Sequence, residues 1–288
     1  MNISATSQDD LRLLAARHKP GYALEQAFYQ SEAVFQRDLD KVFYHEWQLA
    51  GHISEIPEVG DYFLFEMMEE SVIITQGSDG EIHALANVCR HRGSRVCLEP
   101  RGNTKRFTCP YHAWIFNLDG SLFNARMLDK DADKSALGLK RLALEVFHGM
   151  IFVSLAENPN SFDRIRQDLD QILQPFGLAR TKIAHRVQYP VKANWKLLVE
   201  NYNECYHCTA AHPEFSRSHA THMSSERVQP LNEAMAARAK DCGVPTDFID
   251  RIAVNRLPGS PDYAYNRYSL FEGYLTGSED GKALAPLL

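Results

Sequence analysis

Two short clips of cysteine and histidine constrain this 288-residue chain more than any other feature of its sequence. The first clip runs from Cys89 to His91 with one residue between them, and the second from Cys109 to His112 with two. Each follows a predicted strand, so two hairpin tips can face each other. Two thiols and two imidazoles at one place favour either a tetrahedral zinc ion or a [2Fe–2S] cluster in which two His replace two Cys on one iron.

The division of ligands between the clips separates these two readings. Zinc sites usually take two Cys from one clip and two His from the other, whereas each clip here offers one of each. In a mixed cluster each clip gives its Cys to one iron and its His to the other. The spacing therefore predicts a cluster held by Cys89, His91, Cys109 and His112, with zinc and four unrelated loop residues as lesser alternatives. Trp114 is expected to pack over it and limit water.

The sequence around the clips predicts a small all-β domain over residues 47–155. Short β-rich runs at 47–52, 62–67, 71–75, 82–87 and 144–155 alternate with turn clusters. Residues 1–46 are expected to form a helical arm that packs with the C-terminal part. Residues 156–288 are expected to hold a helix over 162–175 capped by Ser161, a strand over 182–191 and a helix from Asn194.

Charge and hydropathy exclude several classes of protein. There are 31 Lys and Arg against 37 Asp and Glu, a formal net charge of −6, which argues against broad nucleic-acid binding. No apolar run approaches the roughly 20 residues of a membrane span, and the polar N-terminus lacks a secretory core. A cytoplasmic location is expected, where disulfides are rare. The six cysteines are then ligands or buried thiols, with Cys97 and Cys242 in the second group.

A second cluster of functional residues lies at 204–212. His207 and His212 are five residues apart, about 140° around a regular helix, so they share a face only if the helix breaks between them. Pro213 disfavours helix at His212 and predicts such a break. Taken alone this pair is a weak signal. Glu204 can be read as an ordinary surface residue, and Cys205 with Cys208 as a redox pair, although no thioredoxin-like context surrounds it.

Taken together, the two motifs resemble the Rieske non-haem iron aromatic-ring-hydroxylating oxygenases, specifically their catalytic α subunit. The resemblance implies an α+β fold, with an N-terminal all-β Rieske [2Fe–2S] domain before an incomplete helix-grip-like catalytic domain. It implies mononuclear Fe(II) at His207 and His212, and O₂ and a small molecule as substrates. It also implies a homotrimer and electrons from NAD(P)H through a separate flavin and iron–sulfur reductase. The family usually has Gly at the position of Ala113, a departure not expected to disturb ligation.

The resemblance also assigns Glu204 and a substrate class. In this family an acid at that position joins a cluster His of one subunit to an iron His of its neighbour, here His112 to His207. Arene dioxygenases generally carry Asp there. Glu204 and the residues around it are closer to the branch that hydroxylates quaternary ammonium compounds such as glycine betaine, carnitine and stachydrine. An arene dioxygenase is the alternative within the enzymes.

The third iron ligand does not fit the family pattern. The family places an Asp well over a hundred residues beyond the His pair, but only 76 residues follow His212, so the chain looks C-terminally truncated. None of the nearer candidates, Asp241, Asp247, Asp250 and Asp262, stands in a familiar context. A truncated, non-catalytic Rieske electron carrier is therefore a second hypothesis. Candidates for an aromatic cage around a quaternary ammonium group are Tyr263, Tyr265, Tyr268, Phe271 and Tyr274.

Overall fold

The computed structural model of the chain describes residues 8–129, 131–203, 207–220, 223–241, 243, 270–276 and 282. It divides into two compact units, described separately below. One is the continuous segment Arg37–Gln188, and the other combines Met1–Gln36 with Tyr189–Leu288. Among the described helices, none combines the length and apolar character that a membrane crossing requires.

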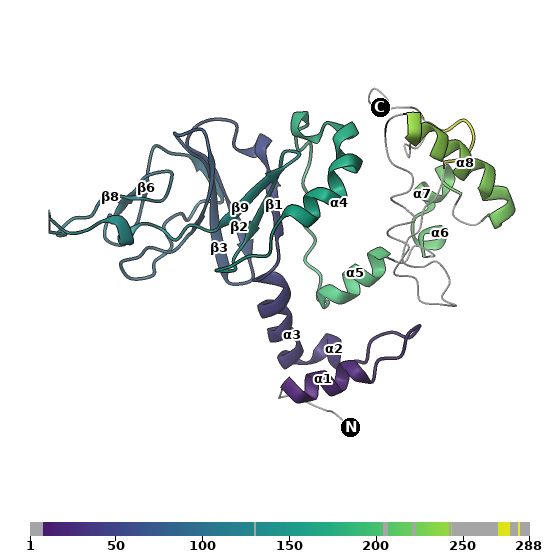
Figure 1. The fold of residues 1–288 in the computed structure, drawn as a ribbon, viewed down its shortest axis with the longest axis horizontal. Coiled ribbons are helices and arrows are strands. Elements are labelled where there is room, and N and C mark those ends of the chain that lie inside the picture. Colours follow the sequence, from purple (N-terminus) through teal and green to yellow (C-terminus); the bar gives the residue numbers. More distant parts are fainter. Residues whose placement is uncertain are drawn as a thin grey trace. The chain divides into compact units, whose positions relative to one another are not determined.

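The segment Arg37–Gln188 is built on three antiparallel sheets (Figure 1). The first has the order β1-β10-β9, with β1 at Gln48–His52, β10 at Met150–Ser154 and β9 at Ala143–Phe147. The second has the order β4-β3-β2-β5, with strands Ile82–Ala86, Glu70–Gln76, Asp61–Met67 and Arg101–Asn103. The third has the order β6-β7-β8, with strands Phe107–Thr108, Ile115–Phe116 and Leu122–Asn124.

Two buried clusters lie on opposite faces of the central strand β3. Ile73 belongs to one, together with Leu85 and both cysteines of the clips, while Val72 and Ile74 belong to the other. Successive side chains of a strand point to opposite faces, so a strand buried on both faces needs an unbroken apolar run. The run Val72-Ile73-Ile74 meets that need and places the clips beside a fully buried core.

The predicted strands around the clips are confirmed, but two details near the end of this unit are wrong. Helix α4 spans Asp163–Leu173, and its N-cap is Phe162 rather than Ser161, although the Ser161 hydroxyl accepts a bond from the Asp163 amide at 3.1 Å. No strand forms over residues 182–191. Their alternating apolar side chains stay exposed, 51% for Val187 and 79% for Tyr189. Alternation alone does not supply the neighbouring strand that a ladder requires.

The second unit is helical in its described part. Its helices are α1 at Gln8–Ala16, α2 at Ala27–Gln30, α5 at Trp195–Asn203, α6 at Cys208–Ala211, α7 at Pro213–Ser218 and α8 at Ser225–Asp241. Helix α3, at Glu32–Asp38, runs across the chain boundary between the units, and the π-helical segment that follows it at Leu39–Phe43 belongs to Arg37–Gln188. The Tyr29 hydroxyl donates to the Glu200 carboxylate at 2.8 Å, and the Asn194 amide donates to the Tyr29 carbonyl at 3.0 Å. These bonds fasten the N-terminal arm to α5.

The α+β class with an N-terminal β domain is confirmed. The boundaries at 46/47 and 155/156 stay a prediction.

Candidate metal centres

The first clip is a tight loop closed by its own backbone. The Cys89 amide donates to the Ser94 carbonyl at 2.8 Å, and the Gly93 amide donates to the Cys89 carbonyl at 2.9 Å. Gly93 has a φ of +73°, a left-handed conformation that glycine adopts without a steric penalty. The loop therefore presents Cys89 and His91 from a fixed base at the end of β4.

The second clip repeats this design with a less suitable residue at its turn. The Cys109 amide donates to the Trp114 carbonyl at 2.8 Å, and the Ala113 amide donates to the Cys109 carbonyl at 3.0 Å. Ala113 has a φ of +56°, where its Cβ costs roughly 1–2 kcal/mol. Alanine thus keeps the shape of this loop at an energetic cost that Gly93 avoids in the first clip.

The structure brings the four predicted cluster ligands together. The His91 and His112 rings lie 4.5 Å apart, centroid to centroid. Both thiols are buried, each with 2% of its residue surface exposed, whereas His91 is exposed and His112 is half-buried. The indole of Trp114 stacks on the His91 ring at 5.0 Å, with 7° between the planes. Cysteines at the inside and histidines at the outside suit a cluster with two chemically different irons.

The donor chemistry of the clips fits a [2Fe–2S] cluster better than a single ion. Within the described residues, no three His, Cys, Asp or Glu side chains are grouped so that they could hold one metal ion. A tetrahedral zinc ion would require all four ligands around one point, whereas the cluster requires only two at each iron. Burial raises the pKa of the Cys89 thiol, so metal binding must displace its proton.

Asn87, which the sequence analysis did not identify, fixes the base of the first clip. Its fully buried side-chain amide donates to the Ser71 hydroxyl at 3.0 Å and to the Cys97 carbonyl at 2.8 Å. Its amide oxygen accepts from the backbone amides of Val96 and Cys97 at 3.0 and 2.8 Å. The sequence signal was a polar residue at the end of an apolar strand, two positions before a ligand. Cys97 is a buried thiol, as predicted, and burial raises its pKa to about 12.

The second predicted site depends on a helix break, and that break is present. Helix α6 ends at Ala211, and His212 has φ −128° and ψ 71°, outside the helical region. Pro213 then begins α7. The break brings the His207 and His212 rings to 5.4 Å between centroids, at an angle of 67°. Two imidazoles at this separation can share one metal ion, which supports the pair as two of three protein ligands.

Several residues that the sequence analysis assigned to this site, to a redox pair or to buried thiols fall outside the described residues. These are Glu204, Cys205, Cys242, Asp247, Asp250, Asp262, Tyr263, Tyr265 and Tyr268. Asp241 closes α8 and belongs to no metal-holding group among the described residues. Phe271 and Tyr274 are described: the Phe271 amide donates to the Ser218 carbonyl, so this segment lies against the end of α7. Cys208 is buried.

Two family profiles match the chain in the order of these two sites. The Rieske [2Fe-2S] domain matches residues 46–143, and the ring hydroxylating alpha subunit (catalytic domain) matches residues 178–267. The glycine betaine monooxygenase oxygenase subunit of Chromohalobacter salexigens is 38% identical over 250 residues, covering 83% of this chain and 56% of that protein. The carnitine monooxygenase oxygenase subunit of Escherichia coli K12 is 36% identical over 210 residues, covering 70% and 55%.

Solved structures of Rieske oxygenases also match the chain. The quaternary ammonium Rieske monooxygenase CntA in complex with L-carnitine matches with a TM-score of 0.62 and 36% identity, covering 67% of this chain and 56% of that one. Naphthalene 1,2-dioxygenase from Rhodococcus sp. matches with a TM-score of 0.60 and 32% identity, covering 66% and 46%. The chain thus spans about half the length of the relatives it matches.

Proposed function

The chain belongs to the family of Rieske non-haem iron oxygenases, as a catalytic α subunit, and from that premise we propose that it hydroxylates a quaternary ammonium compound. One observation carries this proposal. The same chain brings together the two Cys and two His of the clips and, at a helix break, the imidazoles of His207 and His212. The first suits electron storage and the second suits an iron with open positions. Glycine betaine and carnitine monooxygenase relatives support the substrate class.

When bound, the cluster would supply single electrons and the iron would activate O₂ beside the substrate. The overall reaction takes one O₂, two electrons and two protons, places one oxygen atom in a C–H bond and releases the other as water. Hydroxylation of an N-methyl group ends in loss of formaldehyde, and hydroxylation of a carbon beside the nitrogen is the other proposed outcome, which ends in loss of the tertiary amine. The chain's own residues would hold the cluster: the buried thiols of Cys89 and Cys109 would bind one iron, and the exposed His91 and half-buried His112 would bind the other.

Glu204 is proposed to join the two sites across a subunit boundary. Its carboxylate would accept hydrogen bonds from His112 of one chain and His207 of the next, which fixes the tautomer of each imidazole. This role requires a homo-oligomer, proposed as a trimer, with electrons from NAD(P)H through a separate flavin and iron–sulfur reductase. Ligand thiols and this electron source fit a cytoplasmic setting. Glu204→Gln should leave both metals bound and slow oxygenation, and full activity in this variant would overturn the bridge.

The test begins with metal content. Anaerobically purified chain should contain about three iron and two acid-labile sulfide, and give a Rieske EPR signal after reduction. About two iron to two sulfide would favour the alternative of an electron carrier without an oxygen-activating iron. Turnover is then measured as formaldehyde or tertiary amine released from glycine betaine and carnitine. Dihydroxylation of naphthalene with neither product from either betaine would instead support the arene dioxygenase alternative.

A further inference from the structure

We propose that a cationic groove beside the first clip is the docking surface for an acidic electron-donor protein. The groove is lined by Arg90, Lys140 and Arg141, with Glu157 as its one acidic residue and the Ser121 and Ser135 hydroxyls beside them. Its volume is about 540 Å³. This inference rests on the proposed function, because it assumes that the clips carry a cluster that must be reduced.

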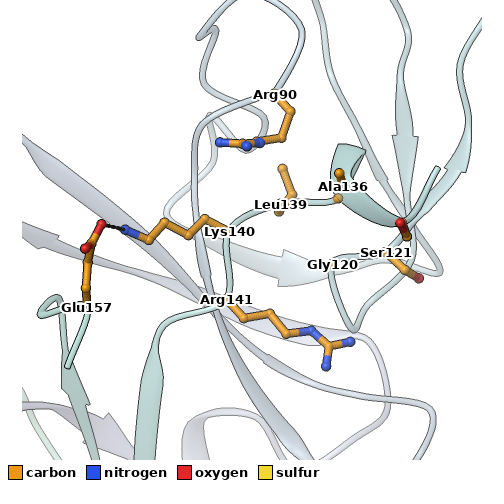
Figure 2. A pocket seen from close by; sticks show the side chains of 10 residues that line it. Arg90, Gly120, Ser121, Ala136, Leu139, Lys140, Arg141 and Glu157 are labelled. Atoms are coloured by element: carbon orange, nitrogen blue, oxygen red, sulfur yellow. Dashed lines mark ion pairs between the residues drawn. The ribbon is translucent and has the colours of Figure 1, made fainter. Parts of the chain in front are cut away.

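The groove is connected to the cluster ligands by rigid structure. Arg90 lies between Cys89 and His91 in the first clip. The opposite wall, the segment that carries Lys140 and Arg141, is fixed to strand β4 because the Ala86 amide donates to the Lys140 carbonyl at 2.9 Å. Figure 2 shows Arg90 over this segment, with Lys140 reaching Glu157. A protein seated in the groove would therefore contact Arg90, the residue that directly precedes the exposed His91 in the chain.

Charge around the first clip is opposite to the charge of the whole chain. Residues 90–106 contain six Arg and Lys and one Glu, whereas the chain carries a net charge of −6. Arg95 and Arg101 are neutralised by Glu66 and Glu55, but Arg90 has no carboxylate within 4.0 Å among the described residues. A local patch of this kind steers an oppositely charged partner during diffusional encounter.

The cations that line the groove remain available to a partner. The Lys140 ammonium is 4.0 Å from Glu157, and both side chains are more than half exposed, so this ion pair is weak. Arg141 bonds the Asp119 carboxylate at 2.8 Å, which holds its chain in place while 58% of the side chain stays exposed.

The occupant that fits is the acidic face of a small iron–sulfur or flavin protein. It would pass one electron to the oxidised cluster, so the donor is oxidised by one electron and the cluster is reduced by one. A small phosphorylated ligand fits less well, because every cation of the groove belongs to an exposed residue and a built anion site would bury one.

The test measures cluster reduction by a reduced plant-type [2Fe–2S] ferredoxin, an acidic protein, in stopped-flow absorbance. The variants are Arg90→Glu and Lys140→Glu, each made in the full chain. Arg164→Glu is the matched control, since it makes the same charge change on α4, where 92% of its side chain is exposed. Iron, sulfide and EPR are measured first in every variant, so that loss of the cluster is distinguished from loss of docking.

At low ionic strength each groove variant should lower the second-order rate constant about tenfold, and the control less than twofold. The wild-type rate should fall as salt is raised, because the Debye length shortens from about 30 Å at 0.01 M to 10 Å at 0.1 M. Reduction by a neutral photoreduced deazaflavin should be the same in all four proteins.

Equal ferredoxin rates in wild type and Lys140→Glu, or a wild-type cluster that deazaflavin reduces and ferredoxin does not, would overturn the docking surface. Absence of the cluster from the wild-type chain would instead overturn the proposed function.

Discussion

The two candidate metal sites rest on very different amounts of local structure. The clips around Cys89 and Cys109 are closed by their own backbone bonds and anchored in a buried core. His207 and His212 flank a helix of four residues, and the next helix has six. Helices this short are not stable by themselves, so the second site must depend on elements around it. The comparison predicts that the cluster site is built by its own domain and the iron site by longer-range contacts.

The largest expected effect comes from removing a cluster ligand. Cys109→Ser replaces a thiolate ligand in the buried half of the site, and should abolish the Rieske EPR signal and all oxygenation. Cys97→Ser is the control, because this thiol is also buried, with 8% of its residue surface exposed, but is assigned no iron. It should retain the signal. A Cys109→Ser chain with an unchanged spectrum would remove Cys109 from the ligand set.

The second prediction separates the two sites. His207→Ala should abolish oxygenation but leave the visible and EPR spectra of the cluster intact, because the two sites use different ligands. Iron should fall from about three to about two per chain, while sulfide stays at about two. The control is His219→Ala, because the His219 ring lies near the pair in sequence but stacks on Phe215. This variant should keep about three iron per chain. Loss of the cluster signal in His207→Ala would show that the sites are not independent.

The third prediction concerns the support beneath the first clip. Asn87→Ala leaves the Val96 and Cys97 amides and the Cys97 carbonyl without their buried partner, and should lower the free energy of unfolding by about 3 kcal/mol. Asn103→Ala removes two exposed side-chain bonds and should cost about 0.5 kcal/mol. Urea unfolding of the full chain measures both. Equal losses would mean that Asn87 is an ordinary polar residue.

Sequence reasoning succeeded where the determinants are local. Ligand spacing and strand periodicity predicted the clips and their sheets, and Pro213 predicted the break at His212, because each effect acts within a few residues. It failed at 182–191, where alternation was present but pairing depends on a distant strand. It also missed Asn87, whose partners Ser71 and Cys97 are brought to it only by the fold. The third iron ligand was not identified for the same reason, because only the fold brings a distant carboxylate to the two histidines.

The smallest predicted effect tests whether the backbone of the cluster site is free of strain. Ala113 holds a φ of +56° at the turn of the second clip, and Ala113→Gly should raise the free energy of unfolding by about 1 kcal/mol, because it removes a Cβ from a left-handed backbone. Ala136→Gly is the control. It lies in the 3₁₀ turn Ser135–Leu137 without a positive φ, and should lower stability by about 0.5–1 kcal/mol through chain entropy. Opposite signs from the same substitution would locate the cost in the clip backbone. Matching losses would mean that the second clip accommodates alanine without strain, and that both clips are equally well adapted to their ligands.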